Sequence, residues 1–335
     1  MIRSIFKRLR TSLLDLVLLL YWYPVRKLIQ GLPHGLVFKL TGTITGLAVL
    51  ISFGVRKQLE AVVPEWFPGA RFDREVKEIV RRSIANYTGR LLEEMYLGSI
   101  TKEQIEKMVA VTGLENLEAS VKRGKGTIIL LSHFGSFLLP LPVIGFMGYR
   151  VSQLGGPPIL KGQRQIQERI FKIKGKDLSG LPVTFLRSDI HLKKAVNALK
   201  MNDLLAIAFD GREGDKWSEV NFLGRKAFFS PGPIRIAQAT GASIVPTFII
   251  RQKDHTHRLI FEKPVVIGEA RKKEPVSVSD MQKLADIFSD YFSSYPCHAI
   301  IYLSITEHRA KKCVFTKSIF KENHGKASCI HHESL

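Results

Sequence analysis

Short, almost wholly apolar runs alternate along this chain with segments that have the spacing of amphipathic helices. The runs at residues 127–131, 204–209 and 244–250 are typical of strands buried inside a sheet. A helix followed by a buried strand, repeated along the chain, predicts the α/β class, with a mixed sheet flanked by helices. By the same criteria we predict helices at 76–95, 102–121, 189–200, 233–240 and 280–295, and further strands at 258–262 and 300–305.

His133 follows the run 127–131 almost directly, and Asp210 directly follows the run 204–209. The carboxyl ends of strands commonly carry catalytic groups in α/β proteins. An imidazole takes up and returns a proton near neutral pH, and Gly135 permits close approach of a backbone. Such residues also cap strands and form turns, so this pattern alone leaves a purely structural role open.

The first sixty residues combine basic, aromatic and apolar side chains in a way typical of a membrane surface. The run 13–23 is too short to cross a bilayer and contains Asp15. The stretch 36–55 has Lys39 as its single charge and is long enough to cross or enter a membrane. We therefore predict a membrane-associated amino terminus, with a soluble helical hairpin as the alternative.

The formal net charge of +20 predicts a polyanionic partner, such as nucleic acid, an anionic membrane or an acidic protein. The chain has no basic and aromatic stacking platform and no known nucleic-acid motif, which disfavours nucleic acid. Its three cysteines lie at 297, 313 and 329, and the core of the chain has no set of cysteines that would form disulfides. This favours a reducing compartment. The histidines and cysteines at 308–332 fit no common zinc spacing, so no metal site is predicted.

Four sequence blocks occur in an order that is typical of one family. They are residues 124–135, Asp210 at the end of its strand, the Asn-Phe-Leu-Gly-Arg block at 221–225, and residues 231–246. On these blocks the chain resembles the lysophospholipid acyltransferase superfamily, and within it the bacterial lipid A biosynthesis (lauroyl or myristoyl) acyltransferases. The resemblance covers about residues 13–305.

The chain is expected to have three parts. Composition predicts a membrane-associated helical segment at residues 1–60 and a disordered basic tail at 306–335, and the resemblance implies a single acyltransferase domain at 70–305. The resemblance also implies a location at the bacterial inner membrane, with the catalytic domain facing the cytoplasm and an anionic membrane surface as a partner.

The resemblance further implies transfer of a fatty acyl group from an acyl carrier protein or coenzyme A thioester to a hydroxyl of a lipid or glycolipid acceptor. His133 would act as general base, and the backbone around Gly135 and Ser136 would stabilise the oxyanion. No metal or redox cofactor is implied, because the thioester is a co-substrate.

The chain departs from the family pattern at one position. In the family an acidic residue stands where this chain has Leu138, and it orients the histidine. We predict that Asp210 supplies the missing carboxylate, with Glu213, Asp215 and Asp189 as further candidates. If none does, the alternative is a catalytically impaired relative that binds lipid or carrier protein without turnover.

Arginine side chains near the site would suit the phosphate groups of either donor, because the guanidinium binds phosphate oxygens in pairs. Arg164 and Arg169 best match an arginine of the family, and Arg187, Arg212 and Arg225 are further candidates. In so basic a chain, any one of these arginines is also explained as solvated surface.

Overall fold

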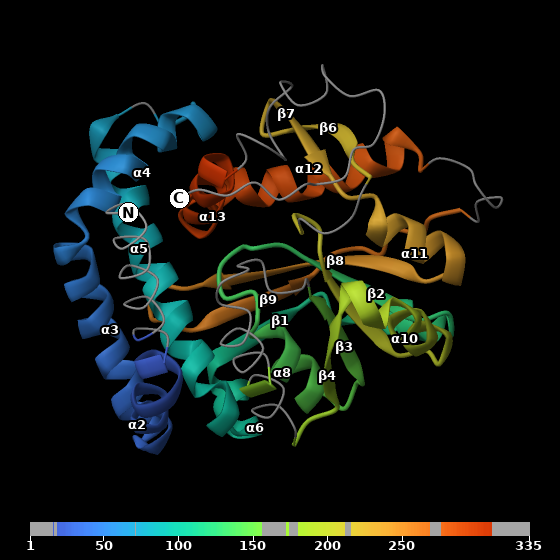
Figure 1. Cartoon of the computed structure of the whole chain (residues 1–335), viewed down its shortest axis with the longest axis horizontal. Coiled ribbons are helices and arrows are strands. Elements are labelled where there is room, and N and C mark those ends of the chain that lie inside the picture. Colours follow the sequence, from blue (N-terminus) through green and yellow to red (C-terminus); the bar gives the residue numbers. More distant parts are fainter. Residues whose placement is uncertain are drawn as a thin grey trace, which may run out of the picture.

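A computed structural model of the chain describes residues 16, 19–70, 72–155, 172–173, 180–211, 216–268 and 276–309. A seven-stranded mixed sheet lies at its centre, in the order β1-β9-β8-β2-β5-β3-β4 (Figure 1). Its strands are β1 (Val109–Thr112), β2 (Thr127–Leu131), β3 (Val151–Gly155), β4 (Val183–Arg187), β5 (Leu204–Ala208), β8 (Ser243–Arg251) and β9 (His257–Phe261). This arrangement confirms the α/β class and the strands predicted at 127–131, 204–209, 244–250 and 258–262.

Side chains that alternate along each strand divide the interior into two apolar cores. In β2, Ile128 and Leu130 belong to one core, and Ile129 and Leu131 belong to the other. The first core includes residues of α10 (Ser188–Lys200), α11 (Gly232–Thr240), α12 (Val278–Ser294) and α13 (Pro296–Arg309). The second includes residues of α6 (Lys102–Met108), α7 (Leu114–Lys122) and α8 (Pro140–Phe146). Because helices cover both faces, the central strands are apolar throughout.

The amino-terminal helices stand together at one side of the sheet (Figure 1). They are η1 (Tyr21–Val25), α2 (Arg26–Gly31), α3 (His34–Ile51), α4 (Phe53–Trp66) and α5 (Asp73–Tyr96), which is followed by the short turn η2 (Leu97–Ser99). Helix α5 packs against α3, α4 and α13 and so joins this group to the sheet domain.

The apolar stretch 36–55 is divided by Ser52, which lies between α3 and α4 with a non-helical backbone. In the part of the chain that the structure describes, no helix has both the length and the apolar character needed to cross a bilayer. We predicted that this stretch is long enough to cross a bilayer, but it does not form one continuous helix.

Two predicted elements are wrong. The helix predicted at 102–121 is interrupted by β1, because Val109–Thr112 pairs with the distant strand β9. The strand predicted at 300–305 belongs to α13. There Ala299, Ile300 and Leu303 are buried at helical spacing, so packing against α4 and α5 outweighs the local strand preference of a β-branched sequence.

A two-stranded hairpin that we did not predict follows the central strand β5. It consists of β6 (Ser218–Phe222) and β7 (Arg225–Phe229), and β6 packs against α12. Leu223 and Gly224 form its two-residue turn, and both have positive φ, as tight hairpins with the twist of the strands require. The family-like block 221–225 is thus this turn.

Candidate active site

The sheet brings His133 and Asp210 together. Strands β2 and β5 are parallel neighbours, and Leu131 is paired with Ala208. Each candidate lies two residues beyond that pair, at the carboxyl end of its strand. Two residues that are 77 positions apart therefore meet because of sheet register.

The Asp210 carboxylate holds His133 at both the main chain and the ring. The backbone N–H of His133 donates to Oδ1 at 3.1 Å and to Oδ2 at 2.9 Å. Ring Nδ1 lies 3.1 Å from Oδ1. The His133 side chain is 42% exposed and that of Asp210 is 24% exposed, so the imidazole is open to solvent on one side. A ring whose Nδ1–H donates to a carboxylate presents Nε2 as its basic nitrogen.

Aromatic rings line one side of the imidazole. The ring centroids of Phe137 and Tyr302 lie 4.9 and 5.9 Å from that of His133. The Arg90 guanidinium lies over Phe137 at 5.5 Å and over Tyr87 at 4.9 Å, and it forms a buried ion pair with Glu94. Phe137 comes from the same loop as His133, and the other residues of this apolar and cationic environment come from α5 and α13.

Gly135 allows the loop after His133 to pass close to β8. Its φ is +56°, and a Cβ at this position would lie 2.6 Å from the carbonyl oxygen of Ile249. This close approach is what the sequence predicted for Gly135. Its N–H donates to the carbonyl oxygen of His298 at 3.1 Å, so the predicted oxyanion contact would require that bond to open.

Leu138 is 8% exposed and lies in the second apolar core with Leu131 and Leu139. The position of the family's acidic residue is therefore occupied by a side chain that packs in the core. Asp210, the residue that we predicted as the replacement, is the carboxylate in contact with the imidazole. Asp189 instead pairs with Arg187 at 2.7 Å.

Ser136 is buried, and its hydroxyl donates to Glu93 Oε2 at 2.5 Å. Its predicted contact with substrate stays a prediction. Arg225 begins β7, and its guanidinium lies 4.7 Å from the ring centroid of Trp66. The remaining candidates lie outside the described residues: Arg164, Arg169, Arg212, Glu213 and Asp215.

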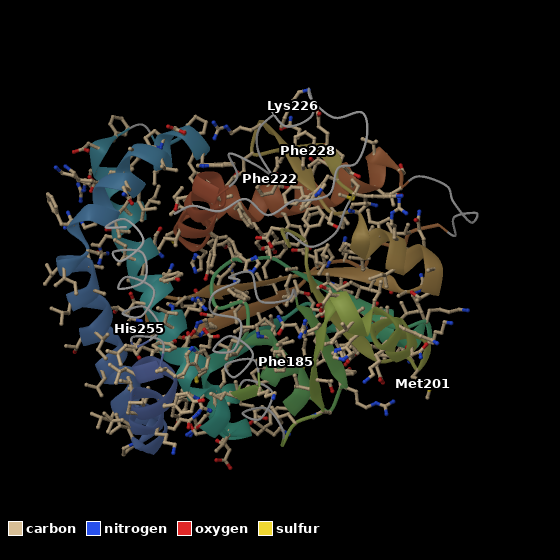
Figure 2. The ribbon with its side chains drawn as sticks, viewed as in Figure 1. Phe185, Met201, Phe222, Lys226, Phe228 and His255 are labelled. Carbon is tan, nitrogen blue, oxygen red and sulfur yellow. The ribbon has the colours of Figure 1, made fainter. Side chains whose placement is uncertain are left out.

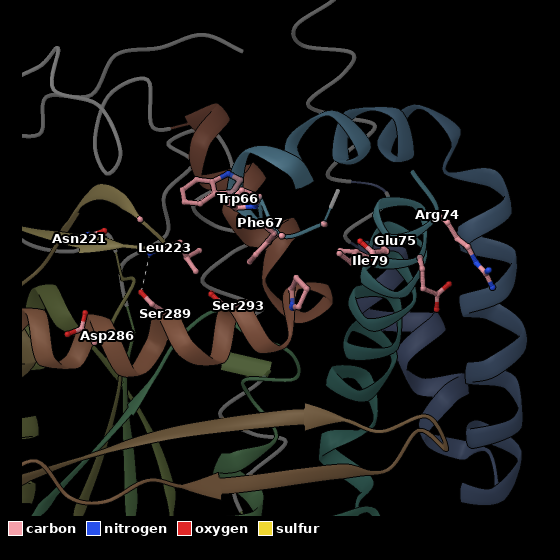
Figure 3. A pocket seen from close by; sticks show the side chains of 16 residues that line it. Trp66, Phe67, Arg74, Glu75, Ile79, Asn221, Leu223, Asp286, Ser289 and Ser293 are labelled. Atoms are coloured by element: carbon pink, nitrogen blue, oxygen red, sulfur yellow. Dashed lines mark hydrogen bonds between the residues drawn. The ribbon is translucent and has the colours of Figure 1, made fainter. Parts of the chain in front are cut away.

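A separate cavity of about 1110 Å³ lies between the α4–α5 connection, the hairpin turn and α12 (Figure 3). Trp66 and Leu223 line it, and the Leu223 N–H donates to Ser289 Oγ at 3.2 Å. Neither His133 nor Asp210 is among its lining residues. Within the described ranges, no group of His, Cys, Asp and Glu side chains is arranged to hold a metal ion.

Several residues of the site were not predicted. The amphipathic pattern places Arg90 and Glu93 on the polar side of α5, yet Arg90 is buried and Glu93 bonds to Ser136. Tyr302 falls in the segment predicted as a strand. Arg251 directly follows the apolar run 244–250, and a charge at the end of a wholly buried strand is a signal that points to it.

The fold and the site together place the protein in one class. Its members are α/β proteins in which a carboxylate orients an imidazole at the carboxyl end of the sheet, an arrangement that is able to deprotonate a hydroxyl. The family model for bacterial lipid A biosynthesis acyltransferases matches residues 8–292. The chain belongs to this family and is therefore an acyltransferase of the kind that acts on lipid acceptors; such proteins are typically membrane-associated. The search of curated proteins found no match.

Proposed function

We propose that the protein transfers a fatty acyl group from an acyl carrier protein or coenzyme A thioester to a hydroxyl of a lipid or glycolipid acceptor, with His133 as general base. The observation that carries this proposal is the 3.1 Å contact between His133 Nδ1 and Asp210 Oδ1. The same carboxylate binds the His133 backbone, so the imidazole has both an orienting group and a charge that stabilises its protonated form.

In the proposed reaction, Nε2 of His133 takes the proton of the acceptor hydroxyl while its oxygen attacks the thioester carbonyl carbon. The new C–O bond gives a tetrahedral oxyanion, and the C–S bond then breaks. The sulfur leaves as thiolate and takes the proton back from the imidazolium, which yields an ester and a free thiol. The reaction needs no cofactor besides the thioester co-substrate.

His133→Ala tests the base directly. The assay measures thiol release and acylated product with myristoyl thioesters of both carrier types and a lipid A precursor in anionic mixed micelles. We expect the rate to fall by about 10³ or more. His255→Asn is the matched control, because His255 lies in the β8–β9 turn with a positive φ that asparagine tolerates (Figure 2). A His133→Ala rate equal to that of the wild type would remove the proposed base.

We also propose that α3 and α4 seat the protein on the inner membrane, with the sheet domain on the cytoplasmic side. Large apolar side chains along these helices are exposed: Leu36, Leu47, Leu50, Ile51, Phe53 and Val55. The exposed basic residues Lys27 and Lys57 lie on the same group of helices, and basic charge favours anionic lipid. Insertion of these exposed apolar side chains into the headgroup region of a bilayer would remove them from water, which supports seating of the protein on a membrane surface.

Vesicle flotation tests this seating. Leu50 and Ile51 are 73% and 75% exposed, and replacing both by Asp should reduce binding to anionic vesicles at least tenfold. Met201→Asp is the control, because Met201 is 68% exposed but lies far from α3 and α4 (Figure 2). Equal binding of the double variant and the wild type would contradict the proposal.

A further inference from the structure

A buried polar cluster lies beneath the loop that carries His133. It joins three elements: Glu93 of α5, Arg251 at the end of β8, and His298 of α13. These residues bind the loop at Gly135 and Ser136, which are two and three residues after His133. Nothing in the proposed proton transfer uses this cluster directly.

The first attachment is made by the Ser136 hydroxyl. It donates to Glu93 Oε2 at 2.5 Å and accepts from Arg251 Nη2 at 3.2 Å. The same Arg251 nitrogen lies 2.7 Å from Glu93 Oε1, and His257 Nε2 lies 3.2 Å from that oxygen. The hydroxyl therefore sits between the two members of an ion pair.

The second attachment is made by the backbone of Gly135. Its N–H donates to the carbonyl oxygen of His298, while the ring Nε2 of His298 accepts from the Arg251 N–H at 3.0 Å. Arg251 thus contacts both attachments, one through its guanidinium and one through its main chain. The loop is held at two successive residues by groups from three different elements.

The cluster is buried, and its Glu93–Arg251 pair is ionised. Ser136, Arg251, His257 and His298 are all less than 9% exposed. Burial opposes ionisation of Glu93, but the charges of Arg251 and His257 and the hydrogen bonds from His257 and Ser136 outweigh it and lower the pKa of Glu93 to about 2. The carboxylate is therefore charged at any physiological pH.

Gly89 makes room for the ion pair. It lies one helical turn before Glu93 on α5, and a Cβ at Gly89 would lie 2.8 Å from Arg251 Nη2. The guanidinium thus lies flat against the helix at a residue without a side chain. A methyl group there would push the guanidinium away from Ser136 and Glu93.

From these contacts we infer that Glu93 and Arg251 are positioning residues, which set the place of the His133 imidazole through Ser136 and Gly135. This inference rests on the proposed function of His133. A buried ion pair is a poor source of stability compared with apolar packing, so stability alone is a weak reason for its presence. Displacement of a reacting group by about 1 Å lowers rates by about 10², so a rigid loop matters for proton transfer.

Ser136→Ala is the primary test, because it detaches the loop from the ion pair and leaves both charges paired. We expect kcat to fall about tenfold, with KM for the myristoyl thioester and for the lipid A precursor within about twofold of the wild type. A raised KM with unchanged kcat would overturn the inference, because it would mean that Ser136 contacts substrate directly.

Gly89→Ala is the second test, since it displaces the guanidinium without removing any polar group. We expect kcat to fall about tenfold. Gly46→Ala in α3 is the matched control: it also replaces a helical glycine, but its Cβ meets no atom within 4 Å, and its kcat should equal that of the wild type. A normal kcat in Gly89→Ala would overturn the inference.

The double variant Glu93→Gln/Arg251→Met reduces the risk of a simple folding defect, because both members of the ion pair are neutralised together and neither is left facing an uncompensated partner. We expect a melting temperature near that of the wild type and a kcat about 10² lower. An unchanged kcat here, with His133→Ala inactive, would overturn the positioning role and leave the proposed base intact. An active His133→Ala would instead overturn the proposed function.

Discussion

The Asp210 carboxylate binds His133 twice, once through the backbone N–H and once through ring Nδ1. The main chain and the side chain of one residue are thus fixed by one group. Rotation of the imidazole away from Asp210 would break only the ring contact, so the carboxylate stays in place to receive the ring again.

Replacement of Asp210 by Asn should keep the fold and impair the reaction. The amide oxygen still accepts from the His133 backbone, but the charge that stabilises an imidazolium is gone. We expect kcat to fall by about 10² to 10⁴ in the acyl-transfer assay. Asp203→Asn is the control. Asp203 directly precedes the amino end of β5, at the opposite end of the strand from Asp210, and it pairs with Arg150. A kcat within twofold of the wild type in Asp210→Asn would contradict the role of Asp210 as the carboxylate that supports His133.

Replacement of Leu138 by Glu should not create a better enzyme, although it restores the family's acidic residue. The new carboxylate would be buried among apolar side chains of the second core, where an unpaired charge is unfavourable. We expect the free energy of unfolding in urea to fall by about 3 kcal/mol, whereas Leu138→Met should lower it by less than about 1.5 kcal/mol. Equal stability with increased kcat would mean that this position still serves the site.

Replacement of Tyr302 by Phe should stabilise the protein. Among the described residues the buried Tyr302 hydroxyl has no hydrogen-bond partner, and removal of an unsatisfied polar group relieves its desolvation penalty. We expect a gain of about 1 kcal/mol in urea unfolding. Tyr291→Phe is the matched control and should lose about 1 kcal/mol, because its hydroxyl donates to Glu262. A loss in both variants would contradict the prediction.

Stability should fall as the pH is lowered from 6.5. Burial, and then the charges of Arg251, Arg82 and His257, lower the pKa of His298 to about 3 in the folded protein. The unfolded chain protonates this histidine near pH 6.5, so between pH 6.5 and 3 the unfolded state binds more protons and the folded state loses stability.

We expect the His298 contribution to approach about 1.4 kcal/mol per pH unit below pH 6. Urea unfolding of the wild type and of His298→Gln at pH 7.5, 6.5 and 5.5 measures it as the difference between the two pH dependences. Parallel pH dependences would show that His298 titrates alike in the folded and unfolded states.

The central strands β2, β5 and β8 were predictable because the pattern that identifies each of them lies within the strand's own sequence. The runs around Ile129, Ala206 and Val245 are apolar and bounded by turns, and their carboxyl ends place His133 and Asp210. β1 and α13 were missed because their states depend on distant partners. Val109 pairs with His257 of β9, and the β-branched sequence around Ile300 packs on α4 and α5.

The polar cluster was beyond sequence reasoning for a related reason. Glu93 is separated from Ser136 by 43 residues, and Arg251 by 115. Helical periodicity assigns Glu93 to the polar side of α5, and only the packing of α5 against the sheet domain makes that side an interior surface. Asp210 was predictable because it directly follows an apolar run and matches an acidic strand-end position of the family, and strand register then brings it to His133.

The parallel pairing of β2 with β5 also governs when this protein acquires its chemistry. A growing polypeptide that has emerged only as far as α8 already carries the imidazole but not the carboxylate that holds it. The proposed proton abstraction therefore has to wait until β5 has been synthesised and has joined its neighbour. Incomplete chains would lack the carboxylate that orients the proposed base during translation.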